Sequence, residues 1–167
     1  QGFESAGVAG MSVLTNNQYF GGSLEDLLLA RQACELPLLR KEFMVDEYQV
    51  LEAKANGADA ILLIAACLER QDIQTLSKLA QQLGMEVLLE VHNADELEKS
   101  IMSSIDMIGV NNRDLKSFTV SLETSKSLVE QIPAEFVKLS ESGLSTSESV
   151  LELRGCGYQG FLMGEHF

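Results

Sequence analysis

Residues 58–67 have the sequence ADAILLIAAC, which contains an unbroken apolar run from Ala60 to Ala65. A run that is short and continuous, without alternating polar residues, is typical of a β-strand buried on both faces. Six more short apolar runs follow this pattern, at residues 11–14, 36–39, 87–89, 107–110, 136–139 and 161–163. We therefore predict seven strands, each covered on both sides.

Amphipathic stretches with helix signals separate the apolar runs. Ser23–Cys34 begins with SLED and Ser145–Arg154 begins with STSE, and in both a serine precedes an acid by three residues, as in helix capping. An apolar stripe at helical spacing is formed by Leu76, Leu79, Ala80 and Leu83. Glycines stand where helix C-caps are expected, at Gly57, Gly84 and Gly155.

The alternation of strands and helices predicts parallel strands with helical crossovers, which leaves two fold classes. One is an open doubly wound sheet, and the other is a closed (β/α)8 TIM barrel. A barrel has eight strands and typically about 250 residues, whereas this chain has 167 residues. However, no glycine-rich phosphate loop of the Rossmann type follows any run. We favour an α/β fold of the (β/α)8 barrel type, incomplete in this chain and forming one domain over residues 1–167.

Composition limits the classes of partner. The chain has 12 basic and 25 acidic residues, a net charge of −13, which argues against binding to nucleic-acid phosphates. It has neither an apolar run long enough to span a bilayer nor a signal peptide at its start, so we predict no membrane association. The three cysteines are too few and scattered for a disulfide framework, so we predict buried thiols in a reducing cytoplasm.

Ligands bind at the carboxyl ends of the strands in both fold classes. Ionisable groups follow five of the seven runs, in RKEF at 40–43, EVH at 90–92, NNRD at 111–114, SESG at 140–143 and GEH at 164–166. Because the carboxyl ends of parallel strands share one edge of a sheet, these groups are expected to line one pocket.

Two of these groups are the preferred catalytic candidates. Lys41 follows the apolar LPLL and Arg40, and Glu90 lies between Leu89 and Val91. A carboxylate inside such an apolar run is either paired or catalytic. Lys41 and Glu90 are therefore assigned to chemistry rather than to the solvated surface.

Structural roles are expected for the other charged groups. His92 lies one residue past a strand tip and is interpreted as a supporting group rather than a general base, and His166 is a weaker candidate. Arg40, Glu42 and Asp114 are expected to form salt bridges between neighbouring strand ends. Two distant histidines without a ligand motif predict no metal site.

Six motifs resemble the indole-3-glycerol phosphate synthase family, in the right order over essentially the whole chain. They are SVLTNNQYFGGS, PLLRKEFMVDEYQVLEAKANGADAILLI, LGMEVLLEVHN, IGVNNRDL, SESGLS and GFLMGE. The resemblance implies a cytoplasmic lyase of tryptophan biosynthesis, an aromatic amino acid pathway. This carboxy-lyase would convert 1-(2-carboxyphenylamino)-1-deoxyribulose 5-phosphate to indole-3-glycerol phosphate, losing carbon dioxide and water, without a metal or organic cofactor.

The resemblance also implies roles for individual residues. Lys41 corresponds to the general acid that protonates the ribulose carbonyl, and Glu90 to the glutamate that transfers a proton during dehydration. Substrate-binding positions are implied for Phe20, Phe43, Leu62, Asn111, Arg113, Leu115, Glu141 and Ser142. Phosphate-binding positions are implied for Gly143, Gly164 and Glu165, where glycine permits close backbone approach.

The chain departs from the family pattern at both ends. The first barrel strand with its E-x-K-x-x-S-P-S motif, the preceding extension and the last helix are absent from the sequence. We therefore expect a chain truncated at both ends and inactive alone. Its exposed barrel edges, 11–14 and 161–163, are expected to allow self-association.

Two alternatives remain open beside the synthase. One is another phosphate-binding barrel enzyme, such as phosphoribosylanthranilate isomerase or an aldose-phosphate epimerase, against which the combination of Lys41, Glu90 and NNRDL argues. The other is a non-catalytic barrel fragment that serves only as a folding or assembly unit.

Overall fold

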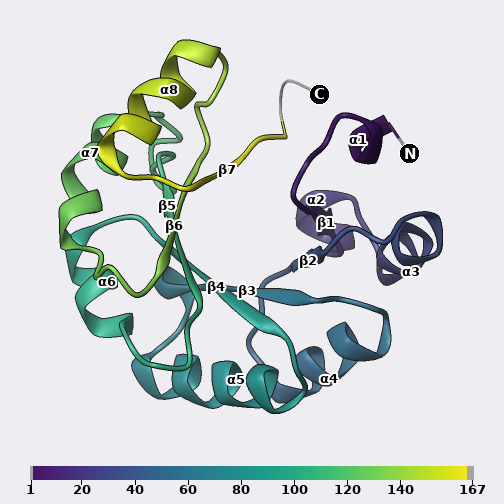
Figure 1. Cartoon of the computed structure of the whole chain (residues 1–167). Coiled ribbons are helices and arrows are strands. Elements are labelled where there is room, and N and C mark those ends of the chain that lie inside the picture. Colours follow the sequence, from purple (N-terminus) through teal and green to yellow (C-terminus); the bar gives the residue numbers. More distant parts are fainter. Residues whose placement is uncertain (1, 165–167) are drawn as a thin grey trace. The chain divides into compact units, whose positions relative to one another are not determined.

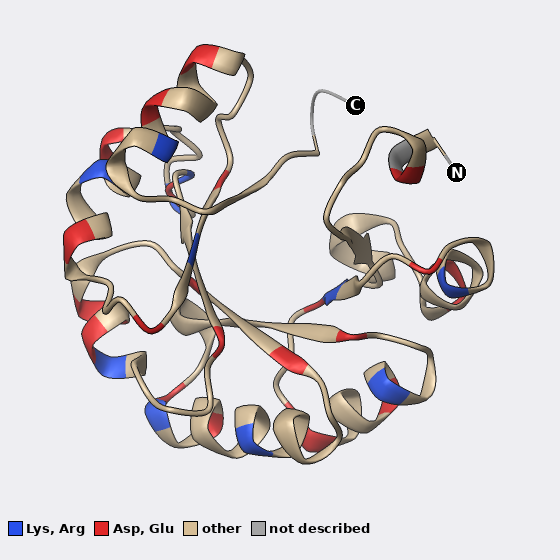
Figure 2. Cartoon of the chain, viewed as in Figure 1, with Lys and Arg blue, Asp and Glu red and all other residues tan. Residues whose placement is uncertain are grey.

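A computed structural model describes residues 2–164. The chain consists of two compact units, Gln1–Val87 and Leu88–Phe167. In each unit the helices lie along one side of the parallel strands (Figure 1). Figure 2 shows most charged residues on helices and in loops and few on strands, so a charged group on a strand needs its own explanation.

Three strands form the sheet of the first unit. β1 (Met11–Leu14) pairs in parallel with β2 (Leu38–Lys41), and β2 pairs in parallel with β3 (Ala60–Ile64). The helical segments of this unit are α1 (Gly2–Ser5), α2 (Asn17–Phe20), α3 (Leu24–Ala33), α4 (Glu47–Ala55), η1 (Ala65–Cys67) and α5 (Arg70–Gln82).

The second unit contains four parallel strands in chain order. They are β4 (Glu86–Val91), whose first two residues belong to the first unit, β5 (Met107–Asn111), β6 (Val137–Glu141) and β7 (Gly160–Leu162). Its helical segments are α6 (Ala94–Ser100), α7 (Glu123–Leu128), η2 (Val129–Gln131) and α8 (Ser147–Cys156).

The apolar runs and capping signals account for most elements. All five residues of β3 are buried, as expected for a strand covered on both faces. Ser23 caps α3 and forms a capping box with Asp26, which confirms the SLED signal. Gly57 and Gly84 follow α4 and α5 with φ of 89° and 69°, a left-handed conformation that glycine adopts without strain.

Some predicted boundaries are wrong for identifiable reasons. β2 begins at Leu38 rather than residue 36; Pro37 has no N–H for strand pairing, and the Leu38 N–H donates to the Asp59 carboxylate, 2.9 Å away. The N-cap of α8 is Thr146 rather than Ser145, since its side chain accepts a hydrogen bond from Ser149 N. α8 continues through Gly155 and is capped by Gly157, with φ of 114°.

The seven predicted strands are all present within residues 2–164. Of the three cysteines, Cys34 is buried as predicted, whereas Cys67 and Cys156 are exposed. Organisation as one domain over residues 1–167 stays a prediction. Across the described residues, every helix is too short or too polar to cross a bilayer.

Candidate active site

Lys41 occupies the last position of β2, beside Leu14 of β1 in the parallel register. Its neighbour Arg40 is buried and points toward α4, where Nη2 lies 2.8 Å from the Glu52 carboxylate. Because side chains alternate along a strand, Lys41 projects from the opposite face, away from that helix. The half-buried Lys41 side chain is therefore presented at the carboxyl end of β2.

Glu42 is held by a network of donors at the ends of β1 and β2. Its carboxylate accepts hydrogen bonds from Thr15 Oγ1 at 3.1 Å, Asn16 Nδ2 at 2.7 Å and Phe43 N at 2.9 Å. Arg40 Nη2 lies 3.9 Å from Glu42 and its Nε donates to Thr15. Arg40 and Glu42 do form ion pairs, but these lie within the end of β2 and between Arg40 and Glu52 of α4, so the prediction of salt bridges between neighbouring strand ends is wrong for both residues.

An aromatic cluster lies next to Lys41 in the chain. Phe20 and Phe43 stack with centroids 5.2 Å apart and an interplanar angle of 15°, and Tyr19 meets Phe43 edge-on at 5.5 Å. These rings form an apolar surface suited to another aromatic ring. Leu62, by contrast, is 1% exposed within β3 and belongs to the core.

In the second unit, Glu90 on β4 meets Asn111 on β5. Asn111 Nδ2 donates to Glu90 Oε1 at 3.1 Å, and Asn111 Oδ1 accepts from Arg113 N at 3.0 Å. The register that pairs Glu90 with Gly109 places Glu90 and Asn111 on the same face. The amide of Asn111 thus links a buried carboxylate to the loop after β5.

Glu141 on β6 joins this face of the sheet. It pairs in register with Asn111, and its carboxylate lies over Gly109 so closely that a Cβ atom there would collide with it. Glycine at position 109 therefore leaves the space that Glu141 occupies. The carboxyl ends of three adjacent strands therefore bring together Glu90, Asn111 and Glu141. Lys41 belongs to the first unit.

His92, just after β4, lies between two carboxylates. Its Nδ1 is 3.0 Å from Glu96 Oε2, and its Nε2 is 3.3 Å from Glu90 Oε1. The second contact is an ion pair rather than a well-aligned hydrogen bond. Burial would lower the pKa of His92, but the two carboxylates outweigh it and raise the pKa to about 9. His92 is thus an imidazolium at neutral pH.

Asn112 is a residue that motif reasoning passed over. Its Nδ2 donates to Ser140 Oγ at 3.0 Å and to the carbonyls of Glu141 and Ser142, at 3.0 and 3.1 Å, while its Oδ1 accepts from Ser125 N. The side chain fixes the turn after β6. The doubling of asparagine in NNRDL is the signal that could have indicated this second role.

The turn after β6 has an unusual backbone. Ser142 and Gly143 adopt consecutive left-handed conformations with φ of 66° and 74°, and such conformations are uncommon for a residue other than glycine. The Val120 side chain occupies the space where a Cβ of Gly143 would lie. The loop after β5 therefore packs against this turn.

The loop after β5 is held by its own hydrogen bonds. Asp114 Oδ1 accepts from Lys116 N, Ser117 N and Ser117 Oγ, at 3.0, 2.7 and 2.9 Å, and the Ser117 N–H in particular lowers the pKa of the carboxyl. The expected salt bridge of Asp114 is thus replaced by a turn. Leu115 is 47% exposed on this loop.

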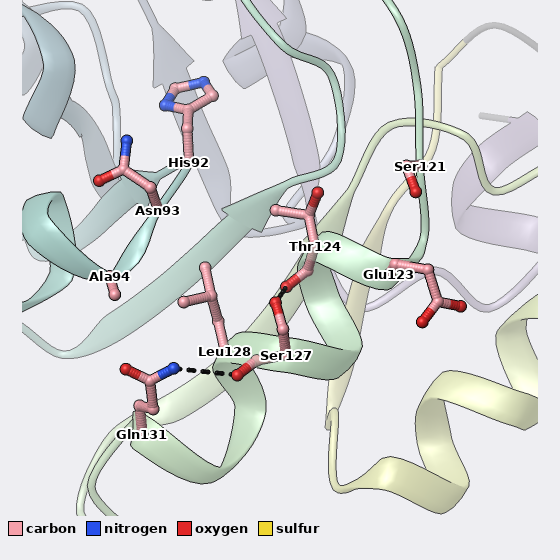
Figure 3. Close-up of a pocket in the computed structure, with 9 residues that line it drawn as sticks. All are labelled: His92, Asn93, Ala94, Ser121, Glu123, Thr124, Ser127, Leu128 and Gln131. Carbon is pink, nitrogen blue, oxygen red and sulfur yellow. Dashed lines mark hydrogen bonds between the residues drawn. The ribbon is translucent and has the colours of Figure 1, made fainter.

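A surface pocket of about 490 Å³ opens beside His92 in the second unit (Figure 3). It is lined by His92, Asn93, Ala94, Ser121, Glu123, Thr124, Ser127, Leu128 and Gln131. No residue assigned above to catalysis or to substrate lines it. Within residues 2–164, no group of three or more His, Cys, Asp or Glu is placed to hold a metal ion. Gly164 is exposed, and Glu165 and His166 lie outside the described residues.

Solved structures with little sequence similarity identify the class of fold. An N-acetylmannosamine-6-phosphate 2-epimerase from Clostridium perfringens matches with a TM-score of 0.75 and 14% identity, over 99% of this chain and 76% of the epimerase. KGPDC from Streptococcus mutans matches with a TM-score of 0.72 and 14% identity, over 92% of this chain and 75% of that one. The fold class is that of a (β/α)8 TIM barrel, as predicted, and the described residues contain seven of its strands.

Sequence similarity is much more specific. The family model for indole-3-glycerol phosphate synthase matches residues 1–167, and the chain belongs to this family. The enzymes of that name from Bacteroides thetaiotaomicron and Dechloromonas aromatica are 50% and 49% identical over 163 and 165 residues. The matches cover 98% and 99% of this chain, which spans 62% and 63% of the length of those relatives.

Proposed function

We propose that the protein carrying this chain is an indole-3-glycerol phosphate synthase, a cytoplasmic carboxy-lyase that acts on a phosphorylated small molecule. The observation that carries the proposal is the meeting of Glu90, Asn111 and Glu141 at the carboxyl ends of adjacent strands. Barrel enzymes place their catalytic groups at this end of the strands. Family membership supplies the substrate, 1-(2-carboxyphenylamino)-1-deoxyribulose 5-phosphate.

The first chemical step in this proposal is ring closure. The aromatic carbon that carries the carboxylate attacks the ribulose carbonyl carbon, and the Lys41 ammonium donates a proton to the carbonyl oxygen, which becomes a hydroxyl. The substrate ring would pack against Phe20 and Phe43, which already stack on each other. The carboxylate then leaves as carbon dioxide, and its bonding electrons return to the ring.

The second step is loss of water. The new hydroxyl accepts a proton from solvent and leaves as water, and the Glu90 carboxylate takes the proton that the adjacent ring carbon loses as the indole double bond forms. A glutamate suits this role when a buried site fixes its position, because proton transfer requires hydrogen-bond distance to the substrate. Asn111 Nδ2 fixes Glu90 from the neighbouring strand.

Substrate recognition is assigned to the groups around this pair. Asn111 would hold the anthranilate carboxylate, with Arg113 supporting it electrostatically, and Glu141 and Ser142 would contact the ribulose. Leu115 would contribute an apolar wall, with the buried Leu62 supporting it from the core, and the phosphate would lie at Gly143, Gly164 and Glu165. Gly143 has a left-handed backbone conformation with φ of 74°, which a glycine adopts without strain.

The test is turnover by the complete gene product, followed by the fluorescence of the indole product. We expect Lys41→Ala to lower kcat by about 10²–10⁴-fold, the usual contribution of general acid catalysis. The matched control is Lys78→Ala, which removes an exposed lysine of α5 and should leave kcat unchanged. An absence of indole product in the wild-type protein, or equal kcat in the two variants, would contradict the assignment.

A further inference from the structure

The imidazole of His92 is fixed by the first turn of α6. Glu96 Oε2 accepts a hydrogen bond from the His92 backbone N–H at 2.8 Å, and the same oxygen lies 3.0 Å from His92 Nδ1. The other oxygen of Glu96 accepts from Asn93 Nδ2 at 2.9 Å, and Glu96 N donates to Asn93 Oδ1. With so many partners, Glu96 is a rigid anchor that sets the orientation of the ring.

The contact with Glu96 determines which ring nitrogen of His92 carries the hydrogen when the ring is neutral. An ionised carboxylate only accepts hydrogen bonds, so Nδ1 facing Glu96 carries hydrogen. A neutral ring would then present the lone pair of Nε2 to the carboxylate of Glu90, 3.3 Å away, which is repulsive. Protonation of Nε2 turns this contact into an attraction, so the two carboxylates together favour the imidazolium.

The Glu90 carboxylate is thereby held from two directions. Asn111 Nδ2 approaches Oε1 from β5 at 3.1 Å, and the His92 ring approaches the same oxygen from the end of β4. The side chain of Glu90 is 4% exposed and that of His92 is 10% exposed. In such a site a neighbouring cation interacts with a carboxylate more strongly than it would in water.

We propose that His92 is a positioning residue for the reaction assigned above: its imidazolium, anchored on Glu96, holds the Glu90 carboxylate in place for proton transfer. The proposal rests on the function proposed for Glu90. It adds two residues, His92 and Glu96, that none of the assigned roles includes. Neither is expected to touch the substrate.

The charges around His92 come from three elements of the second unit. Glu90 approaches from β4 and Glu96 from α6, and Glu123 on α7 lines the same pocket as His92. Glu90 and Glu96 are in contact with the ring and favour its charged form, whereas Glu123 is exposed and forms its own ion pair with Lys126 at 2.8 Å. A change of Glu90 or Glu96 to an amide should therefore make the imidazolium less stable, and a change of Glu123 should have little effect.

Two amide substitutions at position 92 separate the two contacts in the complete gene product. In His92→Gln the amide nitrogen reaches approximately the place of Nε2 and can still donate to Glu90. In His92→Asn the amide nitrogen lies near the place of Nδ1, so only the contact with Glu96 is kept. Both variants remove the charge and keep a polar group beside α6.

We expect His92→Asn to lower kcat by about 10–100-fold, the range for a lost hydrogen bond to a charged group, with KM nearly unchanged. His92→Gln restores a donor to Glu90 but not the charge, so it should recover part of that loss. In both variants the acidic limb of the pH profile of kcat/KM should move to higher pH, because no cation favours the ionised form of Glu90. Equal kcat for His92→Asn and wild type, or equal losses in the two variants, would overturn the proposal.

A second measurement does not depend on activity. In protein labelled with 15N-histidine, the His92 resonances, assigned by their loss in His92→Gln, should show both ring nitrogens protonated at pH 7.5. Glu96→Gln should lower the pH at which the ring loses its proton. A neutral His92 ring at pH 7.5 would overturn the proposal even if the enzyme turns over. Absence of turnover in wild type with a charged ring would instead count against the proposed function.

Discussion

Glu42 and Glu90 are both buried carboxylates near strand ends, 5% and 3% exposed, yet their surroundings differ in kind. Glu42 accepts from a hydroxyl, a side-chain amide and a backbone N–H, and its nearby cation is Arg40. Glu90 accepts from Asn111 and faces the imidazole of His92. One carboxylate is paired with a permanent cation, and the other with a cation that can lose its proton.

This difference separates a structural carboxylate from a candidate for chemistry. The guanidinium of Arg40 stays charged throughout the pH range in which the protein is folded, so the charge on this partner of Glu42 does not change with pH. The pKa of His92 is raised to about 9, so this cation loses its proton above that pH and the surroundings of Glu90 change with it. Burial and position at a strand end, which the two glutamates share, therefore do not identify a catalytic group.

The largest change in stability is expected from removing the permanent cation. Arg40→Met leaves Glu42 buried without its cation and removes the donors to Thr15 and to the Gln49 carbonyl. Breaking a buried pair in this way costs about 3–5 kcal/mol of unfolding free energy, measurable by urea denaturation. Arg154→Met, at an exposed position of α8, is the control. A loss below about 1 kcal/mol would mean that Arg40 contributes no more than a surface pair.

A smaller, pH-dependent effect is expected from the histidine. The pKa of His92 is raised from 6.5 to about 9 in the folded protein, so its stabilisation is complete below pH 6.5 and is lost as the pH rises through 9. The difference in unfolding free energy between wild type and His92→Gln should therefore shrink by on the order of 3 kcal/mol from pH 6 to pH 10. A constant difference over this range would contradict the charged state of His92.

The smallest effect is expected at Thr15, which connects Arg40 to Glu42. Thr15→Val keeps the shape of the side chain but removes the acceptor for Arg40 Nε and the donor to Glu42. We expect a loss of about 1–2 kcal/mol, because both charged groups keep other partners. Thr75→Val in α5, where the hydroxyl donates only to its own helix, is the control. Equal losses of unfolding free energy in the two variants would show that the Thr15 hydroxyl does not contribute to the network of Arg40 and Glu42.

Much of the fold could be predicted because each buried strand is a local apolar run. β3 is the clearest case, since its five residues are all apolar and buried, whereas β1 has the predicted bounds, Met11–Leu14, although it includes Ser12 and no buried residue. The apolar run at 36–39 does not show where β2 begins, and the Asp59 carboxylate that accepts from the Leu38 N–H is distant in sequence. Boundaries set by local chemistry are visible in a sequence, and those set by tertiary contacts are not.

The same distinction applies to the site. Glu90 is conspicuous in the sequence because it interrupts the apolar run LLEV. The roles of Asn112 and Glu96 are not visible there, since Asn112 reaches Ser125 and Ser140 of other elements, and Glu96 resembles any acid in the first turn of a helix. The position of His92 past a strand tip suggests a supporting group, but its two carboxylate partners become visible only in the structure.

The most direct test of the contrast between the two carboxylates compares Glu90→Gln with Glu42→Gln in the complete gene product. Each change removes one charge and keeps the side-chain shape, so kcat and the free energy of unfolding can be measured on matched proteins. We predict that Glu90→Gln lowers kcat by about 10²–10⁴-fold, whereas Glu42→Gln keeps most of the turnover, although both changes lower stability because both carboxylates are buried beside a cation. Loss of turnover in Glu42→Gln equal to that in Glu90→Gln, with both proteins folded, would contradict the account.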